Sequence, residues 1–187
     1  MFKKEIWEII PNLKINWKPA LYWVLNEHAV RKNALIIFIL WSITFVYTFI
    51  TRDFLFFNIL VTTLFIDFFI KISVWPKYSI FSQISNFLVR NKEKQYVWAK
   101  QKRFAWTIWV FMSGTTLFLV LWLWITCGLP MLLCLICLTF MFAEAFFWYC
   151  VWCTIYIFLR NKWYIKKEKY APVCANWACE LEEKNNF

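Results

Sequence analysis

The stretch 131–159 reads MLLCLICLTFMFAEAFFWYCVWCTIYIFL and decides the fold class. Its apolar run is longer than the roughly 20 helical residues that cross a hydrocarbon core of about 30 Å. The same run contains one carboxylate and two Cys-x-x-Cys pairs: Glu144, Cys134/Cys137 and Cys150/Cys153. Charges inside spanning helices are costly and usually functional, and cysteine thiols are reactive groups. The sequence therefore predicts that any chemistry centres on this segment.

The composition is that of an integral membrane protein. Of the 187 residues, 62% are hydrophobic and 23% are aromatic, whereas soluble domains contain roughly 45–50% apolar residues. The net charge of +10 comes from basic residues placed between apolar runs, where they set orientation and contact anionic headgroups. We therefore expect no nucleic-acid partner. The 2 glycines cannot form a phosphate-binding loop, and the single histidine excludes a multi-histidine metal site.

Three further apolar runs of spanning length predict an all-α integral membrane bundle of four transmembrane helices. The predicted spans are 34–51, 54–75, 104–126 and 131–159. An interfacial segment 1–33 precedes this transmembrane domain 34–159, a loop 76–103 divides it, and a tail 160–187 follows it. Within the loop, apolar residues recur at Ile80, Ile84 and Phe87, which predicts an amphipathic helix at the membrane surface.

The distribution of basic residues predicts the orientation. The segments 1–33, 76–103 and 160–187 hold 19 of the 21 Lys and Arg residues. By the positive-inside rule, both termini and the central loop face the cytoplasm. We expect a multi-pass protein of a bacterial plasma (inner) membrane, with Cys150 and Cys153 near its reducing, cytoplasmic side.

Three ionisable residues fall within the predicted spans. Asp67 and Glu144 are expected at the same depth, with Lys71 one turn deeper than Asp67 on the same helix face. Each would cost roughly 2.5–3.5 kcal/mol at a helix centre facing lipid, so all three should face the bundle interior. Two interpretations stay open: a functional cluster, or an Asp67/Lys71 couple that neutralises itself, with Glu144 protonated or bonded to a hydroxyl such as Thr62 or Thr116.

The cysteines of the fourth span fall on two opposite faces of a straight helix. One stripe contains Cys134, Cys137, Met141, Glu144 and Trp148. Because Cys150 and Cys153 lie on nearly the opposite side, Glu144 can reach them only if the helix kinks. For Cys134/Cys137 we favour simple packing over a soft-metal or sulfur path along the stripe. For Cys150/Cys153 a transient disulfide, a soft-metal site, a sulfur carrier or an apolar filler remain in view.

Several short motifs resemble those of a bacterial family of four-helix membrane proteins of unknown function, over roughly 22–160. They are Asn26-Glu27 followed by Arg31, Asp67-Phe-Phe-Ile-Lys71, Pro76-Lys77-Tyr78-Ser79, Lys102-Arg103-Phe104-Ala105, and Glu144 followed by Cys150-x-x-Cys153-x-x-Tyr156. The resemblance implies the four-helix fold and picks out these residues without naming a reaction. The i,i+4 pair Glu27/Arg31 forms a polar cap or, with His28, a functional group; both interpretations stay open.

The leading functional hypothesis is thiol redox or sulfur transfer through Cys150 and Cys153, as a thiol-disulfide oxidoreductase or a persulfide carrier. A thiolate needs nearby positive charge, for which Arg160, Lys162 and Lys71 are the candidates. A thioredoxin-like or sulfurtransferase protein would be the partner; no cofactor is required, and a quinone or a soft metal ion would be compatible. The alternatives are a non-catalytic accessory or scaffold subunit of a membrane complex, and a small oligomeric transporter that uses intramembrane Asp, Glu and Lys residues.

Overall fold

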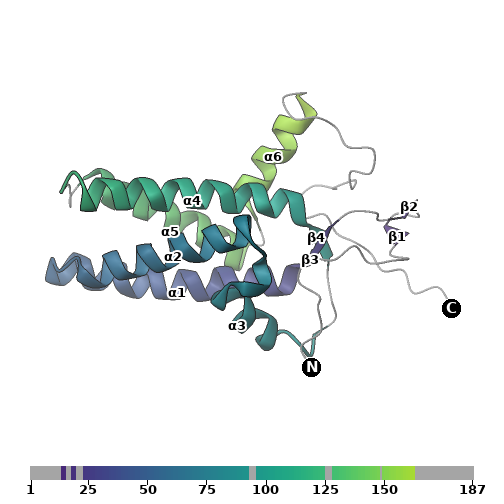
Figure 1. The fold of residues 1–187 in the computed structure, drawn as a ribbon, viewed down its shortest axis with the longest axis horizontal. Coiled ribbons are helices and arrows are strands. Elements are labelled where there is room, and N and C mark those ends of the chain that lie inside the picture. Colours follow the sequence, from purple (N-terminus) through teal and green to yellow (C-terminus); the bar gives the residue numbers. More distant parts are fainter. Residues whose placement is uncertain are drawn as a thin grey trace.

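The computed structural model describes residues 14–15, 18–19, 23–92, 96–124, 128–147 and 149–162. Four long helices form its body: α1 (Glu27–Thr51), α2 (Leu55–Ser73), α4 (Ala99–Leu121) and α5 (Leu129–Phe146). They run side by side in an elongated bundle (Figure 1). α1 packs against α2 and α5, and α4 packs against the same two helices, so the four close into a ring.

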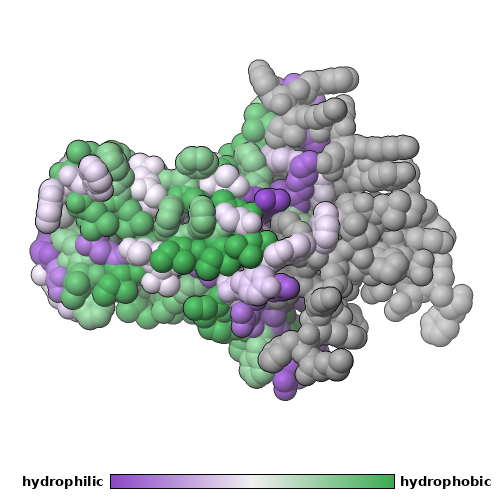
Figure 2. Space-filling model, viewed as in Figure 1, coloured by the Kyte–Doolittle hydropathy of each residue, from purple (hydrophilic) through white to green (hydrophobic). Residues whose placement is uncertain are grey.

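The surface of the bundle is apolar, as a lipid environment requires. Each of the four helices is long and apolar enough to cross a membrane. The shortest, α5, has 18 residues, which extend about 27 Å at 1.5 Å per residue. Large apolar side chains cover the outside, including Ile43 (63% exposed), Ile50 (73%) and Phe111 (70%), and this apolar surface follows the length of the bundle in Figure 2. The predicted all-α membrane bundle of four helices is confirmed.

The core of the bundle is built from aromatic and branched side chains between the helices. Phe68 of α2 stacks on Trp109 of α4 with ring centroids 6.0 Å apart. Farther along the same pair of helices, Gly114 allows close approach, because a Cβ at this position would lie 3.2 Å from the Phe65 ring. Val61 is fully buried between the helices. The tight packing of α2 on α4 positions the polar residues described below.

Two helices begin earlier than their apolar runs predict. α1 starts at Glu27 rather than at residue 34, because the side chain of Asn26 accepts the backbone N–H of His28 and caps the helix. α4 starts at Ala99 rather than at residue 104, directly after strand β4 (Tyr96–Trp98). Hydropathy locates the lipid-facing part of a helix, whereas its ends are set by capping and packing. Both helices therefore extend polar turns beyond the apolar region.

The single helix predicted over 131–159 is wrong. α5 ends at Phe146, and a separate helix, α6 (Val151–Asn161), follows after a short break. The carbonyl of Ala143 accepts the N–H groups of both Phe147 and Tyr149, which ends the regular helical pattern. α6 then leaves the bundle at a steep angle and packs on α4 (Figure 1). Eighteen residues already match the hydrocarbon thickness, so the remaining apolar residues turn away from the bundle axis.

The end of the bundle from which α6 departs carries the smaller elements. Strands β3 (Val24–Asn26) and β4 (Tyr96–Trp98) pair antiparallel, with Leu25 opposite Val97. The 3-10 turn η1 (Pro76–Tyr78) and helix α3 (Ile80–Leu88) lie at the same end (Figure 1). A second small ladder pairs β1 (Lys14–Ile15) with β2 (Lys18–Pro19). The strands are local additions to a helical fold.

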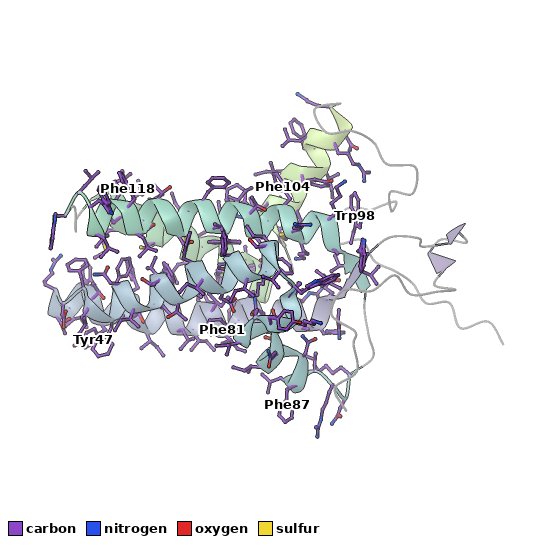
Figure 3. All side chains as sticks on the ribbon, viewed as in Figure 1. Tyr47, Phe81, Phe87, Trp98, Phe104 and Phe118 are labelled. Carbon is purple, nitrogen blue, oxygen red and sulfur yellow. A yellow bond between two sulfur atoms is a disulfide. The ribbon has the colours of Figure 1, made fainter. Side chains whose placement is uncertain are left out.

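Helix α3 confirms the helix predicted from the spacing of apolar residues in the loop. Its serines, Ser82 and Ser85, face the protein, whereas Ile80 (68% exposed) and Phe87 (60%) face outward. Phe87 points away from the bundle in Figure 3. An amphipathic helix with its apolar face outward is suited to the interfacial region of a membrane.

Candidate functional site

Cys150 and Cys153 form a disulfide at the start of α6. Their Cα atoms are 5.2 Å apart, within the range that a disulfide spans without backbone movement. Cys150 is the N-cap residue of α6, and Cys153 lies in its first turn. Both residues are buried, at 7% and 5% exposure, in a cluster with Ala105 of α4 and the Trp152 side chain. The Cys150/Cys153 pair therefore lies between α4 and α6.

The ring of Tyr156 packs α6 against the start of α4. Its ring lies 5.7 Å from Trp98 and 5.2 Å from Phe104, between ring centroids, and both of these partners are labelled in Figure 3. The Arg160 guanidinium lies 5.6 Å from the centroid of the Trp98 ring. These contacts hold the helix that carries the disulfide, so the structure gives Tyr156 a positioning role.

The cations predicted to attract a thiolate have other contacts. Arg160 lies over Trp98 and is seven residues beyond Cys153, about 10 Å along the helix axis. Lys162 lies 4.6 Å from the centroid of the Phe158 ring. Lys71 is engaged within the bundle, as described below. The N-terminus of α6, where Cys150 is the N-cap residue, carries partial positive charge of its own.

Glu144 forms an ion pair with Lys102 rather than a layer with Asp67. Lys102 Nζ donates to Glu144 Oε1 at 2.7 Å, and the two side chains are 6% and 13% exposed. The pair joins the start of α4 to the end of α5. Neither predicted hydroxyl partner is used, because Thr62 and Thr116 donate to carbonyls of their own helices. The predicted bond of Glu144 to one of these hydroxyls is therefore wrong.

Lys102 is the residue that sequence reasoning missed. It was assigned to the polar loop because α4 was expected to begin at residue 104. In the folded chain it lies one turn before Ala105, on the helix face that meets Glu144 and the disulfide cluster. The sequence signal for this pairing is the place of Lys102 in the Lys102-Arg103-Phe104-Ala105 motif at the start of the third span. A carboxylate inside a spanning helix, such as Glu144, needs a cationic partner, and this motif supplies one.

Asp67 and Lys71 form a second, fully internal pair. Lys71 Nζ lies 2.6 Å from Asp67 Oδ2 and donates to Asn33 Oδ1 at 3.3 Å. The hydroxyl of Ser79, the N-cap residue of α3, donates to Asp67 Oδ1 at 2.6 Å. The ammonium also lies 4.9 Å from the centroid of the Phe68 ring. This network connects α1, α2 and α3. It agrees with the interpretation in which Asp67 and Lys71 neutralise each other.

The remaining charged residues of the predicted site serve the helix ends. Arg31 bonds to Glu27 across one turn of α1, at 2.5 Å, and Asn26 caps that helix. Arg103 donates to the carbonyl of Ile72 at 2.8 Å, where α2 is ending. The structure thus places Asn26, Glu27, Arg31 and Arg103 as anchors of helix ends.

Two water-sized cavities lie among these groups. One of about 10 Å³ lies between α1, α4 and α5, and its polar lining comes from Asn33, Lys102 and Glu144. Ala105 lines it as well. The other, of about 20 Å³, is lined by polar side chains including Asn26, Ser82 and Asn86, and again by Asn33. Cavities of this size hold about one water molecule each. Val30, Asn33 and Trp106 line both cavities.

Comparison with known proteins identifies the family. Residues 25–161 match the family model described as "Domain of unknown function (DUF4395)". The chain belongs to the DUF4395 family. No curated protein matches the chain, and no solved structure matches it.

The DUF4395 region coincides with the structural unit. It begins within β3 and ends at Asn161, the last residue of α6. It therefore includes all four spanning helices, α3 and the disulfide, and excludes Cys174 and Cys179, which lie outside the described residues. This agrees with the resemblance over roughly 22–160 and makes α6 an integral part of the DUF4395 domain.

Cys134 and Cys137 lie in the apolar core of the DUF4395 domain. Cys134 and Cys137 are free, buried thiols in the same cluster as Met141. Glu144 continues this side of α5 toward Lys102, whereas Trp148 lies outside the described residues. Within the part of the chain that the structure describes, no three His, Cys, Asp or Glu side chains come together as a metal site. The geometry is that of packing thiols.

Proposed function

We propose that this chain is an integral membrane protein that exchanges disulfides with a dithiol partner through Cys150 and Cys153. The observation that carries the proposal is the disulfide at the first turn of α6, held between two helices of the membrane domain. A Cys-x-x-Cys pair at a helix start is a suitable arrangement for reversible chemistry. Its two sulfurs meet without rearrangement, and the free N–H groups of the helix stabilise a thiolate at the N-cap.

The exchange needs no group beyond the two cysteines and a partner thiol. A partner thiolate attacks one sulfur of the disulfide, and the Cys150–Cys153 bond breaks as the electron pair moves to the other sulfur. A second partner thiol then displaces the mixed disulfide, so the partner is oxidised and the pair is reduced to two thiols. The indole N–H of Trp152 belongs to the same cluster and makes no hydrogen bond within the described residues, so it is an available donor to a thiolate.

The proposed setting is a bacterial plasma membrane with the disulfide end facing the cytoplasm. Support comes from the 19 of 21 basic residues in segments 1–33, 76–103 and 160–187. In this orientation a thioredoxin-like protein could reach the polar end of the bundle. The electrons would pass on to a second dithiol or disulfide carrier, or to a quinone in the bilayer.

Sulfur transfer is a second form of the same chemistry. A persulfide on Cys150 would lie next to the Cys153 thiol, whose attack releases the outer sulfur as sulfide and forms the disulfide. The adjacency of the two sulfurs therefore favours disulfide exchange over long-lived storage of a persulfide.

A trapping experiment tests the proposal. Wild-type protein, expressed in bacterial membranes with a thioredoxin-type protein that lacks its own resolving cysteine, should form a mixed disulfide, because the partner thiolate attacks the Cys150–Cys153 disulfide and no second partner thiol releases it. The C150S and C153S variants should form it much less, because neither can hold the disulfide that is attacked. The matched control is C134S, which should trap as wild type does. Equal trapping by all variants, or none by any of them, contradicts the proposal.

A non-catalytic scaffold subunit is the second candidate, and a specific observation favours it. Both charge pairs deep within the bundle are satisfied internally, Asp67 by Lys71 and Glu144 by Lys102, as packing requires. The Asp67–Lys71 pairing weighs against a transport relay through these residues, which would need groups free to change partner. Undiminished cellular function of a C150A/C153A variant, together with co-purification of a larger complex, would favour the scaffold.

A further inference from the structure

We propose that Glu144 accepts the proton of the buried Cys153 thiol during disulfide exchange, through the cavity beside Ala105. The inference rests on the proposed function, because it assigns a residue to the exchange reaction of Cys150 and Cys153. It gives the Glu144–Lys102 pair a role besides packing.

The break between α5 and α6 is what brings the carboxylate and the disulfide to the same part of α4. Glu144 lies near the end of α5, and the disulfide begins α6. Ala105 lines the small cavity that contains Glu144 and Lys102, and it also packs against both cysteines. Ala105 therefore contacts both the cysteine pair and a water-sized space with a carboxylate in its wall.

The neighbours of the cysteines explain why a proton acceptor is needed. Cys153 is 5% exposed and packs with Ala105 and Trp152, neither of which can accept a proton. A thiol becomes nucleophilic only when its proton leaves, and bulk water does not reach this site freely. Among the residues that line the cavity, Glu144 is the one carboxylate.

The charged groups that face Glu144 are lysine ammonium groups. From α4 it meets the Lys102 ammonium at 2.7 Å. From α1 the cavity wall is Val30, Asn33 and Ala34, and from α2 it is Phe68, none of which titrates. Lys71 of α2 is within electrostatic reach, and from α6 the cysteine pair packs on the other side of Ala105. The other buried carboxylates have partners elsewhere.

The exchange step balances with Glu144 as acceptor. The Cys150 thiolate attacks a substrate disulfide, forms a mixed disulfide, and releases one substrate thiolate. The Cys153 S–H bond breaks, its proton passes through cavity water to Glu144, and its sulfur attacks Cys150 Sγ. The second substrate thiolate leaves, and both substrate thiolates take protons from solvent. Two cysteines are oxidised by two electrons, and one disulfide becomes two thiols.

The cavities also provide a polar exit for the proton. Asn33 lines the cavity that contains Glu144. It also lines the larger cavity, whose walls include Asn26, Ser82 and Asn86 toward the polar end of the bundle. One water in each cavity would leave short steps between polar groups. Glu144 can therefore return its proton to solvent before the next turnover.

The lifetime of the mixed disulfide tests this role. Full-length protein in lipid nanodiscs is reduced and mixed with glutathione disulfide, and acid-quenched samples are analysed by mass spectrometry of the Cys150/Cys153 peptide. At pH 7 the E144Q variant should form the glutathione adduct as fast as wild type but resolve it about 10²-fold more slowly, the lower end of a general-base effect. The defect should shrink as pH rises, because hydroxide replaces the carboxylate. E144D should restore much of the rate.

Two controls separate a chemical role from a structural one. D67N/K71M also removes a buried carboxylate and its lysine partner without leaving an unpaired charge, and it should resolve the adduct as wild type does. E144Q/K102M removes both charges and so avoids a buried unpaired ammonium, yet it should keep the slow resolution.

The outcomes distinguish the inference from the proposed function. Equal resolution rates and equal pH profiles in wild type and E144Q overturn the inference while leaving disulfide exchange intact. A wild-type protein that forms no adduct overturns both.

Discussion

At the scale of single residues, the buried charges Asp67, Lys71, Lys102 and Glu144 of the membrane domain form ion pairs. Lys71 is 1% exposed and is held by Asp67 and Asn33, and Asp67 is also bonded by Ser79. Charges buried this deeply are tolerated because each has an opposite charge and additional hydrogen bonds. The same logic applies to Glu144 and Lys102 at the other pair of helices.

Removing one member of the Asp67/Lys71 pair should be more harmful than removing both. We expect D67N to lower the free energy of unfolding by about 3–5 kcal/mol, because it leaves an uncompensated buried ammonium. The double variant D67N/K71M should recover much of this loss, since no buried charge remains. Unfolding of the purified protein in mixed detergent micelles measures both. A double variant no more stable than D67N would contradict the pairing.

At the scale of elements, the decisive feature is the division of one apolar run into α5 and α6. The sequence between Phe146 and Val151 does not indicate a helix break, because this stretch has no glycine, proline or charge. The break follows from tertiary structure: the membrane thickness is satisfied by α5, and Tyr156 provides α6 with aromatic contacts on α4. A helical wheel that treats 131–159 as one straight helix therefore gives the wrong direction from Glu144 to Cys150 and Cys153.

Truncating Tyr156 should release α6 without unfolding the bundle. Y156A loses ring contacts with Trp98 and Phe104, a change that costs about 3–5 kcal/mol for a buried aromatic. After mild reduction, alkylation of Cys150 and Cys153 in Y156A should be at least tenfold faster than in wild type. Y156F, which keeps the ring, should alkylate at the wild-type rate. If Y156A matches wild type, Tyr156 does not position α6.

At the scale of the whole molecule, the two ends of the bundle differ in charge and structure. The end with α3, β4 and α6 exposes Lys77, Arg90 and Lys100, whereas the opposite turn exposes Arg52 and Asp53. Hydropathy was sufficient to predict that four helices span the membrane, because lipid imposes length and apolarity on each one, but it did not predict where α1 and α4 begin or where α5 ends. The Glu144–Lys102 pair could not be predicted in this way, because it depends on which helices become neighbours and on where α4 begins.

The proposed orientation predicts opposite labelling of the two ends. A cysteine introduced at exposed Asp53 should react with a membrane-impermeant maleimide added to intact bacterial spheroplasts. A cysteine at exposed Lys77 should react only after permeabilisation, because positive residues are retained on the cytoplasmic side. The unmodified chain serves as the background control. Labelling of Lys77→Cys in intact spheroplasts would reverse the assigned orientation.

The most direct test of the central claim is the response of Cys150 and Cys153 in native membranes to mild redox change, read by differential alkylation and mass spectrometry. The account predicts that this pair is recovered as a disulfide after oxidation and as two alkylated thiols after mild reduction. Cys134 and Cys137, which are buried and free, should stay unlabelled in both conditions until the protein is denatured. A Cys150/Cys153 pair that keeps one state under both treatments would contradict the account.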